Sequence, residues 1–428
     1  MLKLNGVKLF HYKNSKDAQT VDIPLPPTVT IPLLQHMGVG CEPVVAVGDI
    51  VKVGQLIGDS EAAFSVPVHS SVAGKVIEVG KYVASTGKVE NQVTIEVAPE
   101  QETIECGPVE VTDQASLVAA ARAAGLAGLG GAGFPTHIKL AYKDIDKVDA
   151  LVINGAECEP YITSDYREMI ESPDDIIAGI ELVQKCLGIE KAYIGIEDNK
   201  PEAIALLNSK VADKPGIRVE ALPSLYPQGA EKVLIYNCTG RIIEEGEIPA
   251  DKGVIVMNIT TVANLYRYVR TGMPLTHKRV TVDGNYVKKP MNVRVPIGTS
   301  ISYVLDYVGV PMEPARKVLM GGPMMGVAVY ELTAPIIKNN NAILLLDEKA
   351  AVFPKTTACI RCGRCIEACP INLMPAALER AYDQGDEERL KQLKVNLCIN
   401  CGCCTYVCPA KRHLAQKNQL AKGLLRKK

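Results

Sequence analysis

Hydrophobic and polar positions form three patterns along the chain, and each pattern predicts a different kind of structure. Between residues 44 and 97, short Val-rich runs separated by Gly turns are typical of a β-sandwich. From 113 to 270, apolar positions at helical spacing alternate with short apolar strands, which predicts an α/β layered domain. From 274 to 333 the chain returns to hairpin-like strands, with a short helix expected after Gly298-Thr299.

The central region divides into an ordered series of elements. A helix is expected over 113–126, with Asp113 or Ser116 as its N-cap, and a Gly-rich loop follows it. Strands are then expected at 150–154, 191–197 and 217–221, and helices at 174–187, 201–211 and 229–237. This alternation is typical of an α/β layered domain.

Composition excludes several classes of protein. Apolar residues make up 47% and charged residues 22% of the 428 positions, so the chain is globular and not disordered. Its 47 basic and 48 acidic residues argue against a chain-wide nucleic-acid surface. No apolar stretch suits a transmembrane helix, and the first residues lack the apolar core of a secretory signal. We therefore expect a cytoplasmic protein, in which clustered Cys residues are ligands or redox groups.

The 14 Cys residues sharpen this picture, because eight of them form two identical motifs. Each motif is C-x2-C-x2-C-x3-C-P, the run that binds [4Fe–4S] clusters in bacterial ferredoxins. Three Cys at this spacing reach three corners of one cluster, and in two-cluster ferredoxins the fourth Cys ligates the other cluster. The first predicted cluster is therefore bound by Cys359, Cys362, Cys365 and Cys408, and the second by Cys398, Cys401, Cys404 and Cys369.

A pair of zinc ribbons is the alternative for these motifs. Zinc sites usually contain two C-x2-C pairs or include His, and the His nearby is His413. Four-Cys strings that end in Pro favour iron–sulfur clusters instead. Cys403 fits neither motif and is expected to be a packing residue. The other Cys residues are scattered, and most are expected to be small core residues: Cys41, Cys106, Cys158, Cys186 and Cys238.

The Gly-rich loop contains G-x-G-x-x-G at Gly128, Gly130 and Gly133. A Rossmann site would need a strand before this motif and a helix opening at its end. Here a helix precedes the loop and Phe134-Pro135 is expected to prevent an immediate helix, so an ordinary Rossmann site is disfavoured. The Gly density indicates that the backbone approaches a ligand closely, with N–H groups available to a phosphate. A mobile surface loop is the alternative.

Two β-rich segments resemble known modules. Residues 45–79 resemble the biotinyl/lipoyl-type β-sandwich, in whose carrier members a Lys at a hairpin tip is acylated. Phe64 stands at that place, so we expect a structural module and not a swinging-arm carrier. Residues 279–310 resemble a soluble-ligand-binding β-grasp module, for which we expect a packing role because no convergent polar cluster is evident.

A more specific resemblance rests on GLAGLGGAGFPTHIK at 125–139 and LVINGAECEP at 151–160. These segments resemble the NADH-binding flavoprotein subunit of respiratory complex I and its relatives. With the β-module, the β-grasp module and the two-cluster ferredoxin run in this order, essentially the whole chain resembles the C component of ion-translocating Rnf electron transport complexes. The resemblance implies a multidomain α/β and α+β chain with a two-cluster ferredoxin-like helical domain.

The resemblance also implies which residues bind FMN and NADH. Beside the flavin it implies Gly128, Gly130, Gly131, Lys139, Asn154, Glu157, Thr260 and Thr261, and toward the nicotinamide nucleotide it implies Phe134, Glu159 and Glu231. It also implies cofactor binding by Gly133, Tyr226 and Gly229. Ala156 and Ala230 replace acidic residues of the family pattern, and the two Thr replace Asn, so the implied site is altered. No catalytic side chain is implied, because the cofactor carries the chemistry.

The implied activity is that of an NAD(H):ferredoxin oxidoreductase subunit. NADH gives up two electrons together and iron–sulfur clusters accept one at a time, so FMN is the required converter. The implied partners are the membrane and peripheral subunits of an Rnf-type complex, NADH and, indirectly, ferredoxin, with no nucleic acid. We expect a peripheral position on the cytoplasmic side of the membrane. The alternatives are a soluble flavin and iron–sulfur oxidoreductase or hydrogenase subunit, and an electron-relay or scaffold subunit with a degenerate flavin site.

Five segments are expected along the chain. They are an N-terminal extension with the β-module at 1–112, the FMN/NADH-binding domain at 113–272, the β-grasp module at 273–345, the ferredoxin-like domain at 346–412 and a basic tail at 413–428. The tail mixes four Leu residues with cations: Leu414, Leu420, Leu424 and Leu425. It is expected either to lie on anionic lipid or a partner, or to be a frayed end.

Overall fold

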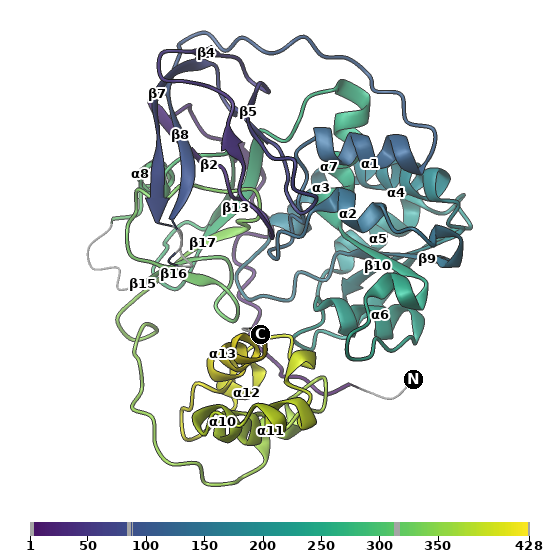
Figure 1. Cartoon of the computed structure of the whole chain (residues 1–428), viewed down its shortest axis with the longest axis vertical. Helices are drawn as coiled ribbons and strands as arrows, with labels where there is room; N and C mark the ends of the chain where they lie inside the picture. Colours follow the sequence, from purple (N-terminus) through teal and green to yellow (C-terminus); the bar gives the residue numbers. More distant parts are fainter. Residues whose placement is uncertain (1–3, 84–86, 88, 312–316, 427–428) are drawn as a thin grey trace.

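The computed structural model describes residues 4–83, 87, 89–311 and 317–426 (Figure 1). The first region after the N-terminal segment contains two small antiparallel sheets. One has the order β2 (Thr28–Pro32), β8 (Val89–Val97), β7 (Gly74–Val83) and β4 (Ile50–Val51); the other has β3 (Glu42–Pro43), β5 (Leu56–Asp59) and β6 (Val68–His69). Buried Val and Ile side chains from both sheets form one core, as expected for the β-sandwich that the Val-rich runs predict.

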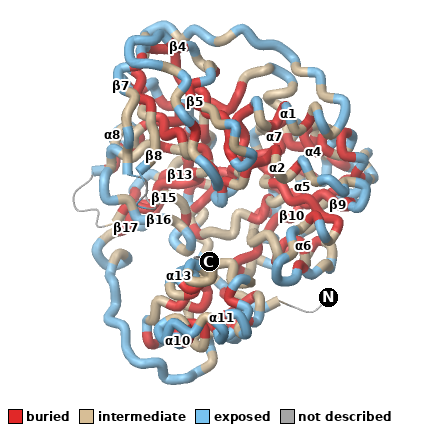
Figure 2. Tube along the Cα trace, viewed as in Figure 1, coloured by how far each residue is buried: buried red, intermediate tan, exposed pale blue. Residues whose placement is uncertain are grey.

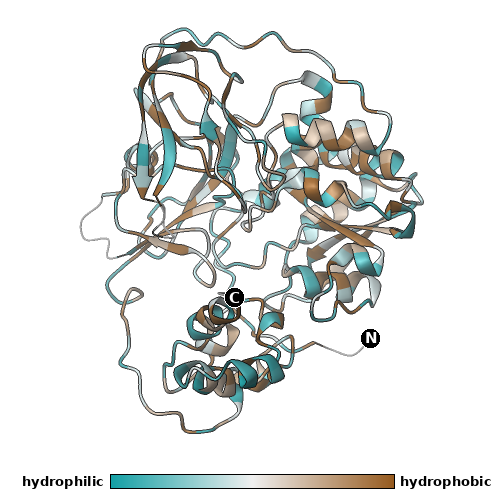
Figure 3. Ribbon diagram, in the orientation of Figure 1, coloured by the Kyte–Doolittle hydropathy of each residue, from teal (hydrophilic) through white to brown (hydrophobic). Residues whose placement is uncertain are grey.

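The middle region of the chain contains a four-stranded parallel sheet. Its order is β11 (Ile217–Leu222), β10 (Lys191–Glu197), β9 (Ala150–Asn154) and β12 (Val254–Asn258). One face is covered by α1 (Gln114–Ala123), α3 (Ser164–Glu171), α4 (Pro173–Leu187), α5 (Pro201–Lys210) and α7 (Ile259–Thr271), and the other by α6 (Glu231–Thr239). Strands with both faces covered are continuously apolar, and Figure 3 shows this band of hydrophobic residues.

The structure confirms the three strands and four helices expected in this region. Asp113 is the N-cap of α1, where its side chain accepts a hydrogen bond from the backbone N–H of Ser116. The sequence interpretation missed α3, β12 and α7. The short 3-10 helices η1 (Ile145–Lys147) and η2 (Pro249–Lys252) precede β9 and β12.

The third region is a six-stranded mixed sheet with one helix. Its order is β1 (Thr20–Asp22), β14 (Met291–Pro296), β13 (His277–Asp283), β17 (Ala342–Leu346), β15 (Lys317–Met320) and β16 (Val327–Val329), and α8 (Ile301–Val308) is the helix expected after Gly298-Thr299. β1 pairs in parallel with β14. The N-terminal extension therefore contributes a strand to this sheet and does not belong to the β-module alone. A strand of only three residues can form there because it pairs with the edge of a sheet that already exists.

The Cys-rich region is helical and is reached through a long exposed loop after β17 (Figure 2). It contains α9 (Arg364–Glu367), α10 (Pro375–Asp383), α11 (Glu387–Gln392), η3 (Val395–Leu397), α12 (Cys403–Tyr406) and α13 (Leu414–Arg426). α13 packs on α10.

This packing corrects the expectation for the basic tail. Leu414 is buried, and Leu424 and Leu425 pack against the core that α10 and α11 form. Leu420 is largely exposed. Residues 413–426 are therefore part of the Cys-rich region and neither a frayed end nor a free amphipathic segment; residues 427 and 428 lie outside the described residues.

Candidate flavin site and iron–sulfur centres

The carboxyl ends of the neighbouring parallel strands β9 and β12 present two Asn side chains. Asn154 donates a hydrogen bond from Nδ2 to the carbonyl of Gly229, at 2.8 Å. Asn258 accepts hydrogen bonds at Oδ1 from the N–H groups of Thr260 and Thr261, and so caps α7. Ligands of open α/β sheets bind outside this edge. Sequence reasoning missed Asn258, although an Asn that ends an apolar run before a helix is a recognisable N-cap signal.

The Gly-rich loop lies beside Asn258. Its ends are joined by a hydrogen bond from the Gly128 N–H to the Phe134 carbonyl, at 2.8 Å. A Cβ on Gly130 would lie 3.0 Å from Asn258 Nδ2, and Gly131 has a left-handed φ of 125°, so both positions favour Gly. In the described part of the chain, the N–H groups of residues 130–132 have no protein hydrogen-bond partner, and these residues are exposed. Such consecutive free N–H groups suit a phosphate.

The chain continues directly into α2 (Thr136–Leu140). The expectation that Phe134-Pro135 prevents an immediate helix is therefore wrong: Pro135 takes the N-cap position, where its missing N–H breaks no helical hydrogen bond. Lys139 on α2 forms an ion pair with Glu231 at 2.8 Å, and its Nζ lies 5.7 Å from the centre of the Phe134 ring. Three residues that the resemblance implied for cofactor binding thus lie together.

The loop after β9 carries Glu157, whose carboxylate accepts hydrogen bonds from the N–H groups of Asp165 and Tyr166 at the start of α3. Burial raises the pKa of Glu157 to about 7. Glu157 and Tyr161 have left-handed φ values of 44° and 71°, a conformation that costs free energy for residues other than Gly. Surrounding contacts must therefore hold this loop.

Two Lys residues that sequence reasoning missed supply these contacts. Lys13 donates from Nζ to the carbonyls of Glu157, Glu159 and Ile162, at 2.6 to 3.0 Å. Lys200 donates to the carbonyl of Ala156 at 2.6 Å. No local sequence pattern predicts these contacts, because Lys13 lies far from the loop along the chain.

Lys13 belongs to a segment, residues 5–18, that we call the N-terminal strap. The Tyr12 ring stacks on Tyr161 with their centres 4.9 Å apart. Val7 forms a two-way backbone pair with Tyr226. Asn5 reaches Asn372 in the Cys-rich region. The strap therefore contacts both the α/β layer and the Cys-rich region.

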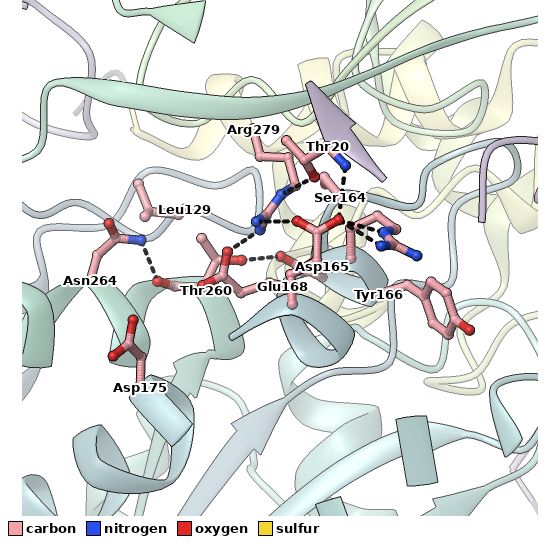
Figure 4. Close-up of polar contacts among 12 residues, drawn as sticks. Thr20, Leu129, Ser164, Asp165, Tyr166, Glu168, Asp175, Thr260, Asn264 and Arg279 are labelled. Carbon is pink, nitrogen blue, oxygen red and sulfur yellow. Dashed lines mark hydrogen bonds and ion pairs between the residues drawn. The ribbon is translucent and has the colours of Figure 1, made fainter. Parts of the chain in front are cut away.

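The hydroxyls of Thr260 and Thr261 have protein partners. Thr260 donates to the Asp165 carboxylate at 2.6 Å (Figure 4), and Thr261 accepts from the Leu129 N–H at 3.0 Å. Thr261 therefore holds the backbone of the Gly-rich loop, and Thr260 joins α7 to the Asp165 side chain of α3. From the mixed sheet, Lys278 on β13 donates to the Leu129 carbonyl, so the β-grasp region has a packing role in supporting the loop.

An ion-pair network joins α3 to the mixed sheet. The buried Glu168 carboxylate binds Arg279 of β13 (Figure 4). Glu168 also binds Arg267 of α7, and Arg279 also binds Glu171. Each charge in the network has an opposite partner, as buried charges require.

Tyr226 and Glu159 lie at the joint with the Cys-rich region. The Tyr226 hydroxyl donates to the Cys401 carbonyl at 2.8 Å and lies 3.5 Å from Glu159 Oε1. Glu159 accepts from the Met324 N–H at 3.0 Å, and burial raises the pKa of Glu159 to about 7. Gly229, by contrast, stays with Asn154 and donates its N–H to Cys158 Sγ.

The four Cys residues predicted to bind the second cluster line one small cavity: Cys369, Cys398, Cys401 and Cys404. No three His, Cys, Asp or Glu side chains in the described ranges converge tightly enough for a single metal ion. A four-iron cluster is wider than one ion, so ligands spaced around a cavity fit it. Cys403, 1% exposed, packs against Val7 and Tyr226, which confirms its expected packing role.

The Cys residues predicted for the first cluster lie nearer the surface. Cys359 and Cys408 lie close enough to Cys365 to influence its pKa, which burial raises. Cys359 and Cys362 are exposed on the loop that precedes α9. Among the scattered Cys residues, Cys41, Cys186 and Cys238 are buried as expected, and Cys106 is exposed.

The β-module also reaches the candidate flavin site. The Phe64 ring packs edge-on against Phe134, with ring centres 5.9 Å apart. The residue found at the carrier-lysine position thus forms a packing contact.

Four family models match successive parts of the chain. They are the RnfC barrel sandwich hybrid domain at 3–100, the Nuo51 FMN-binding domain at 121–267, the SLBB domain at 279–328 and the 4Fe-4S dicluster domain at 358–411. Together these matches describe an iron–sulfur flavoprotein.

Relatives define the family more narrowly. The C component of the proton-translocating ferredoxin:NAD(+) oxidoreductase complex of Clostridium ljungdahlii is 42% identical over 85% of this chain and 82% of its own. Its Na(+)-translocating counterpart from Acetobacterium woodii is 40% identical over 83% and 82%, and the C component of the ion-translocating oxidoreductase complex of Rhodobacter capsulatus is 38% identical over 97% and 81%. The chain belongs to this family, the RnfC proteins.

One solved structure shows a related fold. A chain of an NAD+-reducing [NiFe]-hydrogenase is 20% identical, with a TM-score of 0.51 over 73% of this chain and 62% of that one. Within the described residues, none of the helices combines the length and apolar character that crossing a bilayer requires.

Proposed function

We propose that the Gly-rich loop binds the phosphate of FMN and that Asn154 and Glu157 border its ring system. As a member of its family, the chain transfers electrons among NAD(H), FMN and two [4Fe–4S] clusters within an ion-translocating ferredoxin:NAD(+) oxidoreductase complex. The observation that carries the site assignment is the free N–H groups of residues 130–132, which lie at the carboxyl edge of the parallel sheet.

When bound, FMN exchanges electrons in pairs with NAD(H) and singly with the clusters. The protein's contribution is placement. Thr261 and Lys278 hold the Gly-rich loop, and Lys13 and Lys200 hold the loop of Glu157. Lys139, paired with Glu231 beside Phe134, supplies a cation and an aromatic face for a nucleotide.

The order of cofactors that we propose places the second cluster next to the flavin domain: Cys369, Cys398, Cys401 and Cys404 would hold it there, where it would exchange single electrons with the flavin. The contact that supports this order is the hydrogen bond between Tyr226, in the α/β layer, and the carbonyl of the ligand Cys401. The exposed Cys359 and Cys362 would hold the first cluster near the surface, where it would be the entry or exit for electrons exchanged with another protein.

The surface around that exit favours an acidic one-electron carrier. The cations Lys355, Arg361, Arg364 and Lys411 are exposed there. Among the described residues, none of the four forms an ion pair. The apolar side chains of Phe353 and Ile360 are also exposed. Such a basic rim with an apolar centre suits a negatively charged redox protein. We further propose that the chain is a peripheral subunit on the cytoplasmic side of its membrane complex.

Anaerobic purification with iron, sulfide and flavin analysis tests this proposal. We expect about eight iron atoms per chain from two four-iron clusters, together with one bound FMN and NADH-dependent reduction of ferricyanide. Clusters without FMN binding would instead support the electron-relay alternative. Zinc in place of iron would contradict the cluster assignment.

A further inference from the structure

Asn418, on α13, is a buried polar side chain beside a predicted cluster ligand. It is 1% exposed and lies beside the Cys398 thiol, but within the described residues neither Nδ2 nor Oδ1 makes a hydrogen bond of ordinary geometry. Leaving a buried polar group unpaired costs free energy, because the group loses its hydrogen bonds to water. Such a group calls for a specific explanation.

The surroundings of Asn418 supply that explanation. It lines the same cavity as the four Cys residues predicted to bind the second cluster. The other wall residues from α13 and the segment before α10 are apolar, among them Ala415, Leu373 and Ile371. An iron–sulfur cluster with four thiolate ligands is anionic and rich in sulfur acceptors, so an amide N–H is the group that such a cavity can use.

We propose that Asn418 tunes the second cluster by donating an N–H hydrogen bond to one of its sulfur atoms. The inference rests on the proposed function, since it requires the cluster. Hydrogen bonds to the sulfurs of iron–sulfur clusters help to set their reduction potentials. A donor stabilises the reduced cluster more than the oxidised one, because reduction adds negative charge. Asn418 therefore makes the second cluster easier to reduce.

The first motif offers an internal comparison. Glu379 follows the last Cys of that motif at the same distance as Asn418 follows the last Cys of the second. Glu379 is also buried, but its carboxylate is paired with Arg412 at 2.6 Å and Lys417 at 3.3 Å. The same helical position is thus satisfied within the protein in one repeat and left unpaired at the cavity in the other.

The test compares Asn418→Leu and Asn418→Asp with Gln419→Leu, a control on the same helix whose side chain is exposed. Redox titrations of the full-length holoprotein, followed by electron paramagnetic resonance, measure the two cluster potentials separately. We expect both Asn418 variants to shift the second potential to more negative values, the Asp variant further because of its charge. The first potential and the Gln419→Leu protein should match wild type.

Iron content distinguishes a failure of the proposed function from a failure of the proposed role of Asn418. A wild-type protein without iron would contradict the proposed function itself. Asn418 variants that keep about eight irons but show an unchanged second potential would overturn the role of Asn418. If the Leu variant loses its cluster, the nearly isosteric Asp variant decides, and an unshifted or more positive potential in it would equally overturn the proposal.

Discussion

The two Cys motifs share one local structure and differ in what surrounds them. Arg361 and Asn400, at the same place in each motif, both have a φ of 55°, and each motif continues through a left-handed Gly into a four-residue helix. The first motif nevertheless exposes Cys359 and Cys362, whereas Cys401 and Cys404 of the second are buried. The spacing of the Cys residues therefore determines the backbone conformation of each loop, and the neighbouring domain determines how far the loop is exposed.

The residues between the Cys ligands also differ between the exposed first motif and the buried second motif. Arg361 and Arg364 are exposed in the first motif. Asn400 and Cys403 take their places in the second, and Cys403 is packed against the α/β layer. A charged side chain at the position of Cys403 would lose its hydration at that joint. The composition within each motif thus indicates which cluster faces solvent and which faces the flavin domain.

The largest expected effect comes from removing a ligand. Cys369 stands in the first motif but is predicted to bind the second cluster, with Cys398, Cys401 and Cys404, so Cys369→Ser should remove the buried cluster and about half of the iron. Iron analysis and electron paramagnetic resonance would measure this loss. Cys403→Ala is the control and should retain all the iron; a Cys369→Ser protein that loses the exposed cluster instead would contradict the assignment.

Charge reversal in the exposed motif is expected to act on partner binding. Arg361→Glu combined with Arg364→Glu should weaken association with an acidic two-cluster ferredoxin about tenfold or more at low salt, because both charges then repel the partner. Binding measured at two salt concentrations checks this, with exposed Arg218→Glu on β11 as control. Equal loss with the control would remove the case for a local docking face.

Tyr226→Phe should loosen the buried motif from the α/β layer. The variant loses the hydroxyl that donates to the Cys401 carbonyl, a change worth about 1 kcal/mol. Rapid-mixing kinetics should show slower cluster reduction by NADH, with the rate of flavin reduction retained. Tyr330→Phe, at a residue that is 84% exposed, should leave both rates unchanged.

The smallest effect concerns pH at the same joint. Burial raises the pKa of Glu159 from 4.5 to about 7, so the protonated form is favoured in the folded state. The free energy that protonation of Glu159 contributes to the stability of the folded state is fully present below about pH 4.5. It is lost as the pH rises through about 7. Between pH 6 and 8 this loss amounts to about 1 kcal/mol. Thermal unfolding should show a weaker pH dependence for Glu159→Gln than for wild type over that interval; parallel curves would contradict the assignment.

Much of the fold could be predicted from the sequence, because apolar runs and their spacing report local structure. The strands 150–154 and 191–197 agree with β9 and β10 at both ends. Both ligand sets are predictions from the motif spacing, and the four Cys residues of the second set line one cavity. What failed depended on distant contacts. Lys13 has no local signal, and the place of α13 depends on its packing with α10.

In the candidate site, too, some features follow from the sequence and others depend on distant contacts. Phe134, Lys139 and Glu231, which the family resemblance implied for cofactor binding, lie together. Tyr226 and Glu159 belong instead to the joint with the second motif, a role that depends on where the Cys-rich region docks. Asn418 is an ordinary polar helix residue in the sequence and becomes notable only once its buried surroundings are known.

The N-terminal strap has a consequence for biosynthesis. Asn5, Val7 and Lys13 contact residues that follow much later in the chain, and β1 pairs with β14. During synthesis from the N-terminus, the strap and β1 therefore have no partners until those later segments have left the ribosome. Contacts between distant residues also slow folding, because the intervening chain must first be ordered. The part of this chain that is made early is thus among the last to be fixed, and its docking joins domains that have already formed.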